Sequence, residues 1–268
     1  MIITPRRNSL YFNLKEVVRY RDLLFTLAYR DLRIKYAQTA IGFTWAFLNP
    51  LFQILILSFV FGVVAKFDTG STPHILYTAA GMCGWTYFSD LLSSASGSII
   101  GAQAMVKKVY FPRLILPLSK ALPALVDLGV MLLLIFILML IYGIAPSINI
   151  LWFPLFLFVA ISSGLAIGIW MSALTIRFRD FTYITPLLLR LGMYATPIAY
   201  PASAVPEQYK FVFYMNPMAG VVEGVRWSLI GGEAPNTYSY LSFGIVFVLF
   251  VTGLLYFNRI ERKIADIV

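Results

Sequence analysis

The sequence contains little charge, because only 12% of its 268 residues are Asp, Glu, Lys or Arg, against about 25% in soluble domains. A single cysteine, Cys83, excludes an internal disulfide, and a single histidine, His74, excludes a histidine-rich metal site. Apolar residues make up 60% of the chain, which excludes a disordered or collagen-like protein. Long uncharged stretches explain this composition, so we expect an all-α protein that crosses a membrane several times.

The sequence also lacks the common motifs of enzyme sites. It has no G-x-x-x-x-G-K-[ST] phosphate loop, no H-E-x-x-H, no C-x-x-C and no G-x-S-x-G. We therefore expect no catalytic residue, no metal site and no cofactor in this chain. An integral membrane enzyme would need acids clustered at one interface, and Asp90, Asp127 and Asp180 show no such clustering in the sequence.

Six segments approach the roughly 20 mostly apolar residues that a spanning helix needs. The clearest has no charge in 25 residues, and the weakest contains Arg190 and two prolines. In chain order, the predicted spans are 41–65, 75–100, 121–145, 151–176, 181–200 and 241–257.

The basic residues are distributed unevenly around these spans. Seventeen of the 21 Lys and Arg residues fall before the first span, in the second and fourth loops, or after the last span. Three fall on the other side. The positive-inside rule then predicts cytoplasmic termini, and the excess charge suits anionic lipid headgroups, so we expect no nucleic-acid partner. The first 40 residues show no apolar run typical of a cleavable signal peptide.

The segment 14–36 has the pattern of an amphipathic helix that lies on the membrane surface. Such a helix either anchors and orients the first span or also docks a cytoplasmic partner through its polar face. At 100° per residue, the apolar face consists of Leu14, Val17, Val18, Leu24, Phe25, Ala28 and Leu32.

The second cytoplasmic loop is short, basic and stiffened by Pro112 and Pro117. A helix that begins at Ala102 would end near Phe111, because proline disfavours helical backbone at the residue before it. The loop is either a charged determinant of topology or a functional element.

The stretch 201–232 is long and only partly polar. Its segments 207–214 and 218–230 are apolar enough to re-enter the bilayer as two short helices, separated by Asn216–Pro217. An ordinary surface loop is the alternative.

Polar residues inside the predicted spans are expensive and need a partner or water. Asp90, Asp127 and Arg190 either hold helices together or line a route. Stacked aromatic rings along such a route suit sugars, whose C–H faces pack on π surfaces while their hydroxyl groups need hydrogen-bond partners. Ordinary helix packing is the alternative. The polar and aromatic residues in the first two spans are Thr44, Trp45, Asn49, Gln53, Trp85, Tyr87 and Ser89.

This layout resembles the ABC-2 permeases of polysaccharide export, and within them the O-antigen polysaccharide permeases, with teichoic-acid and capsule permeases as sister families. Four segments carry the resemblance: YRDLRIKYAQTAIGFTWAFLNPL (29–51), VKKVYFPRLILPLS (106–119), RFRDFTYITPLLLRLGMYATPIAYP (177–201) and NPMAGVVEGVRWSLIGG (216–232).

The resemblance implies a half-transporter in the bacterial cytoplasmic membrane. Two copies would form the channel for a lipid-linked polysaccharide, and two separate ATPase subunits would hold ATP and Mg²⁺. The residues implied in ATPase contact are Arg30, Asp31, Arg33, Lys35 and Tyr36. A cytoplasmic helix over 102–116 would also meet the ATPase, and it would gate entry of the lipid headgroup with Lys107, Lys108, Tyr110 and Arg113. The translocation path would include Trp45, Asn49, Gln53, Trp85, Tyr87, Arg190 and Tyr194, and the hairpin 201–232 would close its outer mouth.

Two alternatives remain within the same family, an exporter of teichoic acid or capsule and an exporter of small molecules or lipids. The basic loop and the Tyr- and Trp-rich spans favour the polysaccharide.

Overall fold

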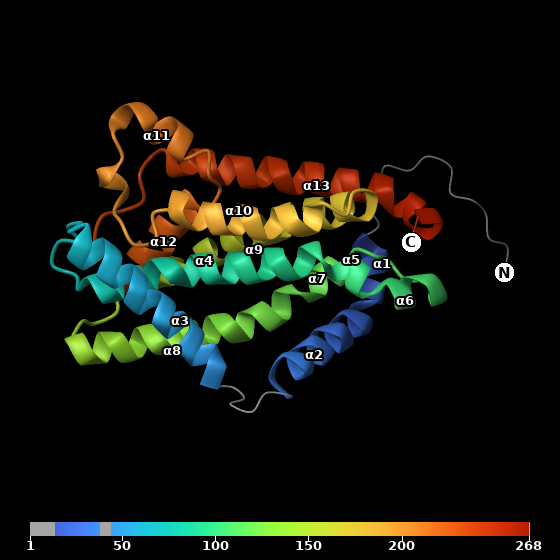
Figure 1. Cartoon of the computed structure of the whole chain (residues 1–268), viewed down its shortest axis with the longest axis horizontal. Coiled ribbons are helices and arrows are strands. Elements are labelled where there is room, and N and C mark those ends of the chain that lie inside the picture. The colour runs from blue at the N-terminus through green and yellow to red at the C-terminus, as the bar shows by residue number, and fades with distance from the viewer. Residues whose placement is uncertain (1–13, 38–43, 268) are drawn as a thin grey trace.

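The structure is a computed structural model that describes residues 14–37 and 44–267. All regular elements of the described residues are helices, which confirms the all-α prediction. The long helices α4, α8, α9, α10 and α13 run along the long axis of the molecule, and the long helix α3 crosses it obliquely (Figure 1). Their bounds are α3 Thr44–Ser58, α4 His74–Ser96, α8 Ala121–Tyr142, α9 Phe153–Arg177, α10 Phe181–Ala195 and α13 Ser239–Ile267.

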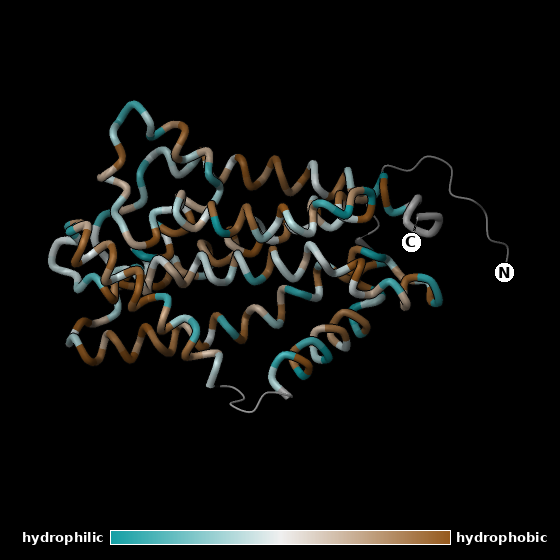
Figure 2. The backbone as a smooth tube through the Cα atoms, viewed as in Figure 1, coloured by the Kyte–Doolittle hydropathy of each residue, from teal (hydrophilic) through white to brown (hydrophobic). Residues whose placement is uncertain are grey.

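Hydrophobic residues dominate these long helices, whereas α2 alternates between polar and hydrophobic positions (Figure 2). Within the part of the chain that the structure describes, four helical segments are long and apolar enough to cross a membrane: Thr44–Val64, Ile115–Tyr142, Ile148–Arg177 and Ser239–Glu261. The first includes the π-helical segment η1 (Phe59–Val64), and the third includes the short 3-10 helix η2 (Ile148–Trp152).

The helices α4 and α10, which correspond to the predicted spans 75–100 and 181–200, do not belong to this set. With 15 residues, α10 reaches only about 22 Å. The longer α4 carries many Gly, Ser and Thr residues and Asp90, which lower its apolar character. It can tolerate them because it packs against α3, α8, α9, α10 and α12 and is largely buried. A count of six spans therefore stays a prediction.

Small residues let α9 approach α4 closely. A Cβ atom at Gly168 would lie 2.7 Å from the Cβ of Ala95, and one at Gly164 would lie 2.9 Å from the Leu91 side chain. The two glycines are four residues apart, the spacing that allows close contact between membrane helices.

The segment 14–36 forms two helices, α1 (Leu14–Arg19) and α2 (Arg21–Ala37), with a turn at Tyr20 instead of one continuous helix. Part of its predicted apolar face packs on protein, because α2 contacts α7 (Ile115–Ser119) and α8. Ala28 is buried there, whereas Phe25 is 57% exposed.

The loop after α4 contains the short helices α5 (Ser98–Gly101) and α6 (Gln103–Lys108). The expected helix from Ala102 to about Phe111 thus ends earlier, at Lys108. Extended backbone begins at Val109, since β-branched and aromatic residues precede Pro112 and weaken a helix there. This loop, α1 and the carboxyl end of α13 lie at the same end of the molecule (Figure 1).

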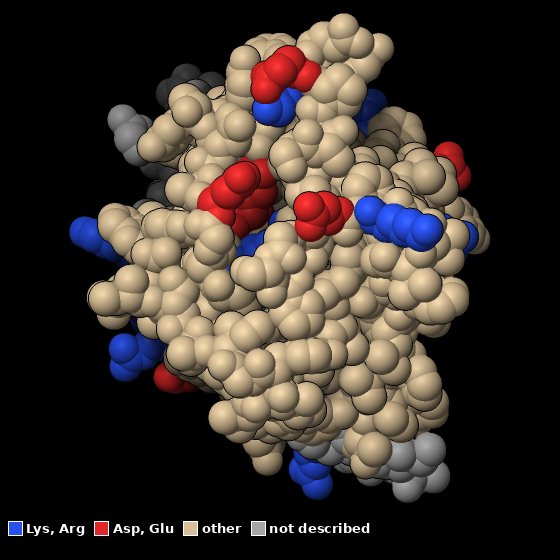
Figure 3. Space-filling model, turned by 90° about the vertical axis from the view of Figure 1, so that its left-hand side faces the viewer, with Lys and Arg blue, Asp and Glu red and all other residues tan. Residues whose placement is uncertain are grey.

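The opposite end holds the stretch 201–232, which forms η3 (Ala202–Ala204), α11 (Glu207–Phe213) and α12 (Ala219–Ile230). The helix α12 returns into the bundle and packs against α4, α9 and α13. Seen from this end, a few acidic and basic side chains lie on a mostly uncharged surface (Figure 3).

Candidate functional site

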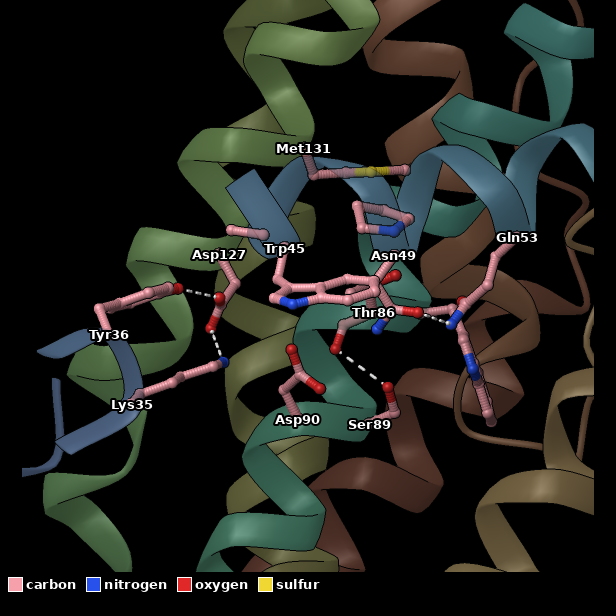
Figure 4. Close-up of a pocket in the computed structure, with 13 residues that line it drawn as sticks. Lys35, Tyr36, Trp45, Asn49, Gln53, Thr86, Ser89, Asp90, Asp127 and Met131 are labelled. Carbon is pink, nitrogen blue, oxygen red and sulfur yellow. Dashed lines mark hydrogen bonds and ion pairs between the residues drawn. The ribbon is translucent and has the colours of Figure 1, made fainter. Parts of the chain in front are cut away.

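A pocket of about 480 Å³ opens between α2, α3, α4 and α8 (Figure 4). Its volume lies within the range of roughly 300–1,000 Å³ that is usual for ligand sites. Thirteen residues line it: Lys35, Tyr36, Trp45, Ala46, Asn49, Pro50, Gln53, Trp85, Thr86, Ser89, Asp90, Asp127 and Met131.

One wall is a polar stripe on α3. Trp45, Asn49 and Gln53 follow each other at intervals of four residues, so they share one face of the helix. The Gln53 amide donates a hydrogen bond to the Asn49 side-chain oxygen over 3.2 Å. The Trp45 indole is 51% exposed and presents its ring to the pocket. These three predicted path residues therefore lie together.

The opposite wall belongs to α4 and carries Trp85, Thr86, Ser89 and Asp90. Trp85 is nearly buried, because it packs against Phe88 and lies under α10 at Gly192. Asp90 directs its carboxyl group into the pocket (Figure 4). The wall thus offers one indole edge, two hydroxyl groups and one carboxyl group.

The third wall joins α2 to α8 through Asp127. The Lys35 ammonium lies 2.7 Å from one oxygen of this carboxylate, and the Tyr36 hydroxyl donates to the other over 2.5 Å. Burial and the hydrogen bond to Asp127 both raise the pKa of Tyr36. Lys35 and Tyr36, predicted as ATPase contacts, therefore face the bundle as well.

A second cavity of about 300 Å³ continues from the first beneath α2 and shares Lys35, Asp90 and Asp127 with it. Lys120 pairs with Asp31 in its wall, and Arg30 also donates to Asp31. Burial alone would raise the pKa of the Asp31 carboxyl group, but the hydrogen bonds from Lys120 and Arg30 hold it below its usual range.

The remaining predicted path residues lie elsewhere. Tyr87 is buried on another face of α4 and donates to the Ala121 carbonyl oxygen over 3.2 Å. Arg190 and Tyr194 are exposed on α10 and do not line either cavity.

The basic loop stands apart from the pocket and is held from two sides. Tyr110 donates to the Glu16 carboxylate of α1 over 3.3 Å. The Arg113 backbone N–H donates to the Glu261 carboxylate of α13 over 2.7 Å. Lys107 and Lys108 are exposed at the end of α6.

The helix α12 carries the centre of a buried polar cluster, Glu223 and Arg226, and neither residue was predicted as a site residue. The Arg226 guanidinium donates to the Tyr77 hydroxyl and to the carbonyl oxygens of Pro197 and Ile198. One turn away, Glu223 accepts hydrogen bonds from Tyr214. An acid and a base three residues apart in the apolar run 218–230 are the sequence signal for this cluster.

Comparison with known proteins identifies the family. The family model described as ABC-2 type transporter matches the sequence of residues 22–230, well over half of the chain. The chain belongs to this family. The matched region begins in α2 and ends with α12, so it contains the pocket, the basic loop and the buried polar cluster.

The ABC-2 chain is similar over nearly its whole length to export proteins. It is 28% identical to an O-antigen export system permease protein RfbA of Klebsiella pneumoniae, across 92% of this chain and 95% of that protein. Identity to the RfbA protein of Myxococcus xanthus is 27%, across 88% of this chain and 90% of that protein. Identity to the polysialic acid transport protein KpsM of Escherichia coli is 24%, across 88% and 93%. Together with the four apolar helices, the family membership makes this chain a multi-pass membrane protein.

Proposed function

We propose that this chain is the membrane-spanning subunit of an ATP-binding-cassette exporter that moves a lipid-linked, O-antigen-like polysaccharide across the bacterial cytoplasmic membrane. The observation that carries the proposal is the pocket between α2, α3, α4 and α8, in which the Trp45 ring faces amide, hydroxyl and carboxyl groups. The names of the RfbA relatives support the same class of substrate.

The chemistry of the pocket suits a sugar. A flat indole takes the C–H face of a sugar ring, and the side chains of Asn49, Gln53 and Ser89 can exchange hydrogen bonds with its hydroxyl groups. An exporter of apolar molecules would gain little from this lining, because polar groups without partners cost free energy when an apolar ligand covers them.

The chain would work as two copies with two separate ATPase subunits, which would bind ATP and Mg²⁺. The exposed side chains of Arg30 and Arg33 on α2 are the ones available for an ATPase contact. Asp31, Lys35 and Tyr36 would instead pass movement of α2 to the bundle, because their side chains bond to α8 and to Lys120, which precedes it.

The basic loop would receive the lipid headgroup. Lys107 and Lys108 present two exposed ammonium groups, which suit a pyrophosphate through charge-assisted hydrogen bonds. Tyr110 and Arg113 would hold the loop in position through their contacts with α1 and α13.

The proposed topology has six crossings and cytoplasmic termini. The lengthwise helices alternate in direction along the chain (Figure 1). In the sequence, 17 of the 21 basic residues fall before the first predicted span, in the second and fourth loops, or after the last span. The stretch 201–232 would then cover the outer mouth, with α12 re-entering the bundle.

The test is a deletion of the gene in its own host, with complementation by the wild-type chain. We expect loss of glycan from the cell surface and accumulation of lipid-linked glycan inside, with both effects reversed by complementation. Glycan that still reaches the surface without the chain would refute the proposal. Loss of a capsule instead of an O-antigen would assign the chain to capsule export, as the similarity to KpsM allows.

A further inference from the structure

Asp90 is a charged side chain of the pocket to which the described residues offer no direct partner. Its carboxyl group is partly buried, lines both cavities and forms no hydrogen bond or ion pair with any described residue. A carboxylate withdrawn from bulk water normally has a hydrogen-bond donor or a cation beside it. The Asp90 carboxyl group lies where the two cavities meet, so it can accept hydrogen bonds from a ligand in either of them.

The charged side chains around Asp90 form ion pairs with one another. Lys35 pairs with Asp127, which also accepts from Tyr36. Lys120 and Arg30 both pair with Asp31. The two cavities together are lined by three Asp and two Lys residues, and Arg30 adds a third cation beside Asp31. Among these described charges, Asp90 is the acid without a direct ion pair.

An aromatic platform faces this carboxylate. The Trp45 indole projects from α3 into the same cavity that Asp90 enters from α4 (Figure 4). A sugar ring stacked on an indole presents its hydroxyl groups at the edge of the ring, where a carboxylate can accept two of them.

We infer that Trp45 and Asp90 form a sugar subsite that accepts neutral or amino sugars and excludes acidic sugars. The inference rests on the proposed function and narrows its substrate class. A sugar carboxylate brought beside Asp90 would be repelled, and repulsion between like charges grows as water leaves the pocket. Hydroxyl or ammonium groups would instead supply the donors that Asp90 lacks. The subsite therefore favours an O-antigen-like glycan over a polyanionic one.

The binding experiment uses the full-length chain in detergent and follows its tryptophan fluorescence. The probes are three trisaccharides of similar length: maltotriose, which is neutral, a glucosamine trimer, which is cationic, and a sialic acid trimer, which is anionic. We expect the first two to bind at least about tenfold more tightly than the third, because hydrogen bonds to a charged group contribute strongly. Asp90→Asn should reduce this preference, and most strongly for the glucosamine trimer.

Two further variants keep the result interpretable. Asp68→Asn removes an exposed carboxylate in the loop between η1 and α4 and should leave all three affinities unchanged. Trp45→Leu retains Asp90 but removes the platform, so binding of both favoured probes should fall by at least tenfold while the elution volume of the protein stays constant.

Equal affinity of the wild-type chain for all three probes, or an unchanged preference in Asp90→Asn, would overturn the inference. Complementation of the deletion strain separates this failure from failure of the proposed function. If Asp90→Asn and Trp45→Leu both restore surface glycan at the wild-type rate, the subsite is wrong although the exporter stands. If deletion itself does not affect surface glycan, the exporter is wrong.

Discussion

Lys35 and Asp127 are 92 positions apart in the sequence, yet their side chains form an ion pair of 2.7 Å between the last turn of α2 and the first half of α8. Asp127 is 12% exposed, whereas Lys35 is 47% exposed, so the acid depends on this pair more than the base does. The helix α2 is not long and apolar enough to span a membrane, whereas α8 belongs to a segment that is. The ion pair therefore attaches α2 to a membrane-spanning candidate.

The ion pair between Lys35 and Asp127 can be tested by exchanging the charges. Lys35→Asp should destabilise the fold by about 1–3 kcal/mol and impair export, because it leaves the less exposed Asp127 beside a second acid. Adding Asp127→Lys should recover part of both losses. Lys15→Asp, at an exposed position of α1, is the matched control and should have little effect. Thermal unfolding and surface glycan are the measurements; failure of the double variant to recover would show that the pair does not hold α2.

Gly81 provides a test of close packing. A Cβ atom at this position would collide with the Ile198 carbonyl oxygen and the Arg226 guanidinium, so Gly81→Ala should lower stability by at least about 1–3 kcal/mol. Gly129→Ala is the matched control, because nothing lies within 4 Å of a Cβ there. In a helix interior this change should be neutral or raise stability by up to about 1 kcal/mol. In detergent, the melting temperature of Gly81→Ala should therefore fall, whereas that of Gly129→Ala should stay the same or rise.

Arg226 should not tolerate lysine. Its planar guanidinium donates hydrogen bonds to the Tyr77 hydroxyl and to two carbonyl oxygens through two different nitrogen atoms. The single nitrogen of a lysine ammonium group cannot reproduce this forked arrangement of donors. We expect Arg226→Lys to cost roughly 2–4 kcal/mol, since buried acceptors lose their donors. Arg259→Lys, at an exposed position on α13, should leave the melting temperature unchanged. A melting temperature of Arg226→Lys equal to that of wild type would show that the fork contributes little.

The basic loop can be tested without disturbing insertion. Lys107→Glu combined with Lys108→Glu should reduce export strongly, because the lipid headgroup would meet two acids, while 15 basic residues remain on the side predicted to be cytoplasmic. Membrane fractionation should show normal amounts of the chain. Normal export by this variant would argue against headgroup recognition at the loop.

The helical fold and the α3 stripe could be predicted from the sequence, because both depend on local periodicity. A charge-free run predicts α3 and η1, and residues four apart, such as Trp45 and Asn49, must share a face. The same geometry explains why Tyr87 does not join Trp85 in the pocket, since two residues along a helix turn the side chain by about 200°.

Other parts of the site depend on contacts between segments that are far apart in the chain. A single sequence does not show which of these segments meet. The pairing of Lys35 with Asp127 and of Lys120 with Asp31 is of this kind, so residues predicted to face a partner also face the bundle. The ATPase contacts and the headgroup gate stay predictions.

The hold of Glu261 on the Arg113 backbone gives the carboxyl end of α13 a role in positioning the basic loop. This bond joins residues 148 positions apart, and at this loop the N–H group of Arg113 would otherwise need water or another acceptor. Truncating the chain before Glu261 would therefore remove the contact between the basic loop and α13. The contact of Tyr110 with Glu16 of α1 would then be left to position the loop. Affinity tags and fusion partners are better placed beyond a spacer that leaves this final part of the helix undisturbed.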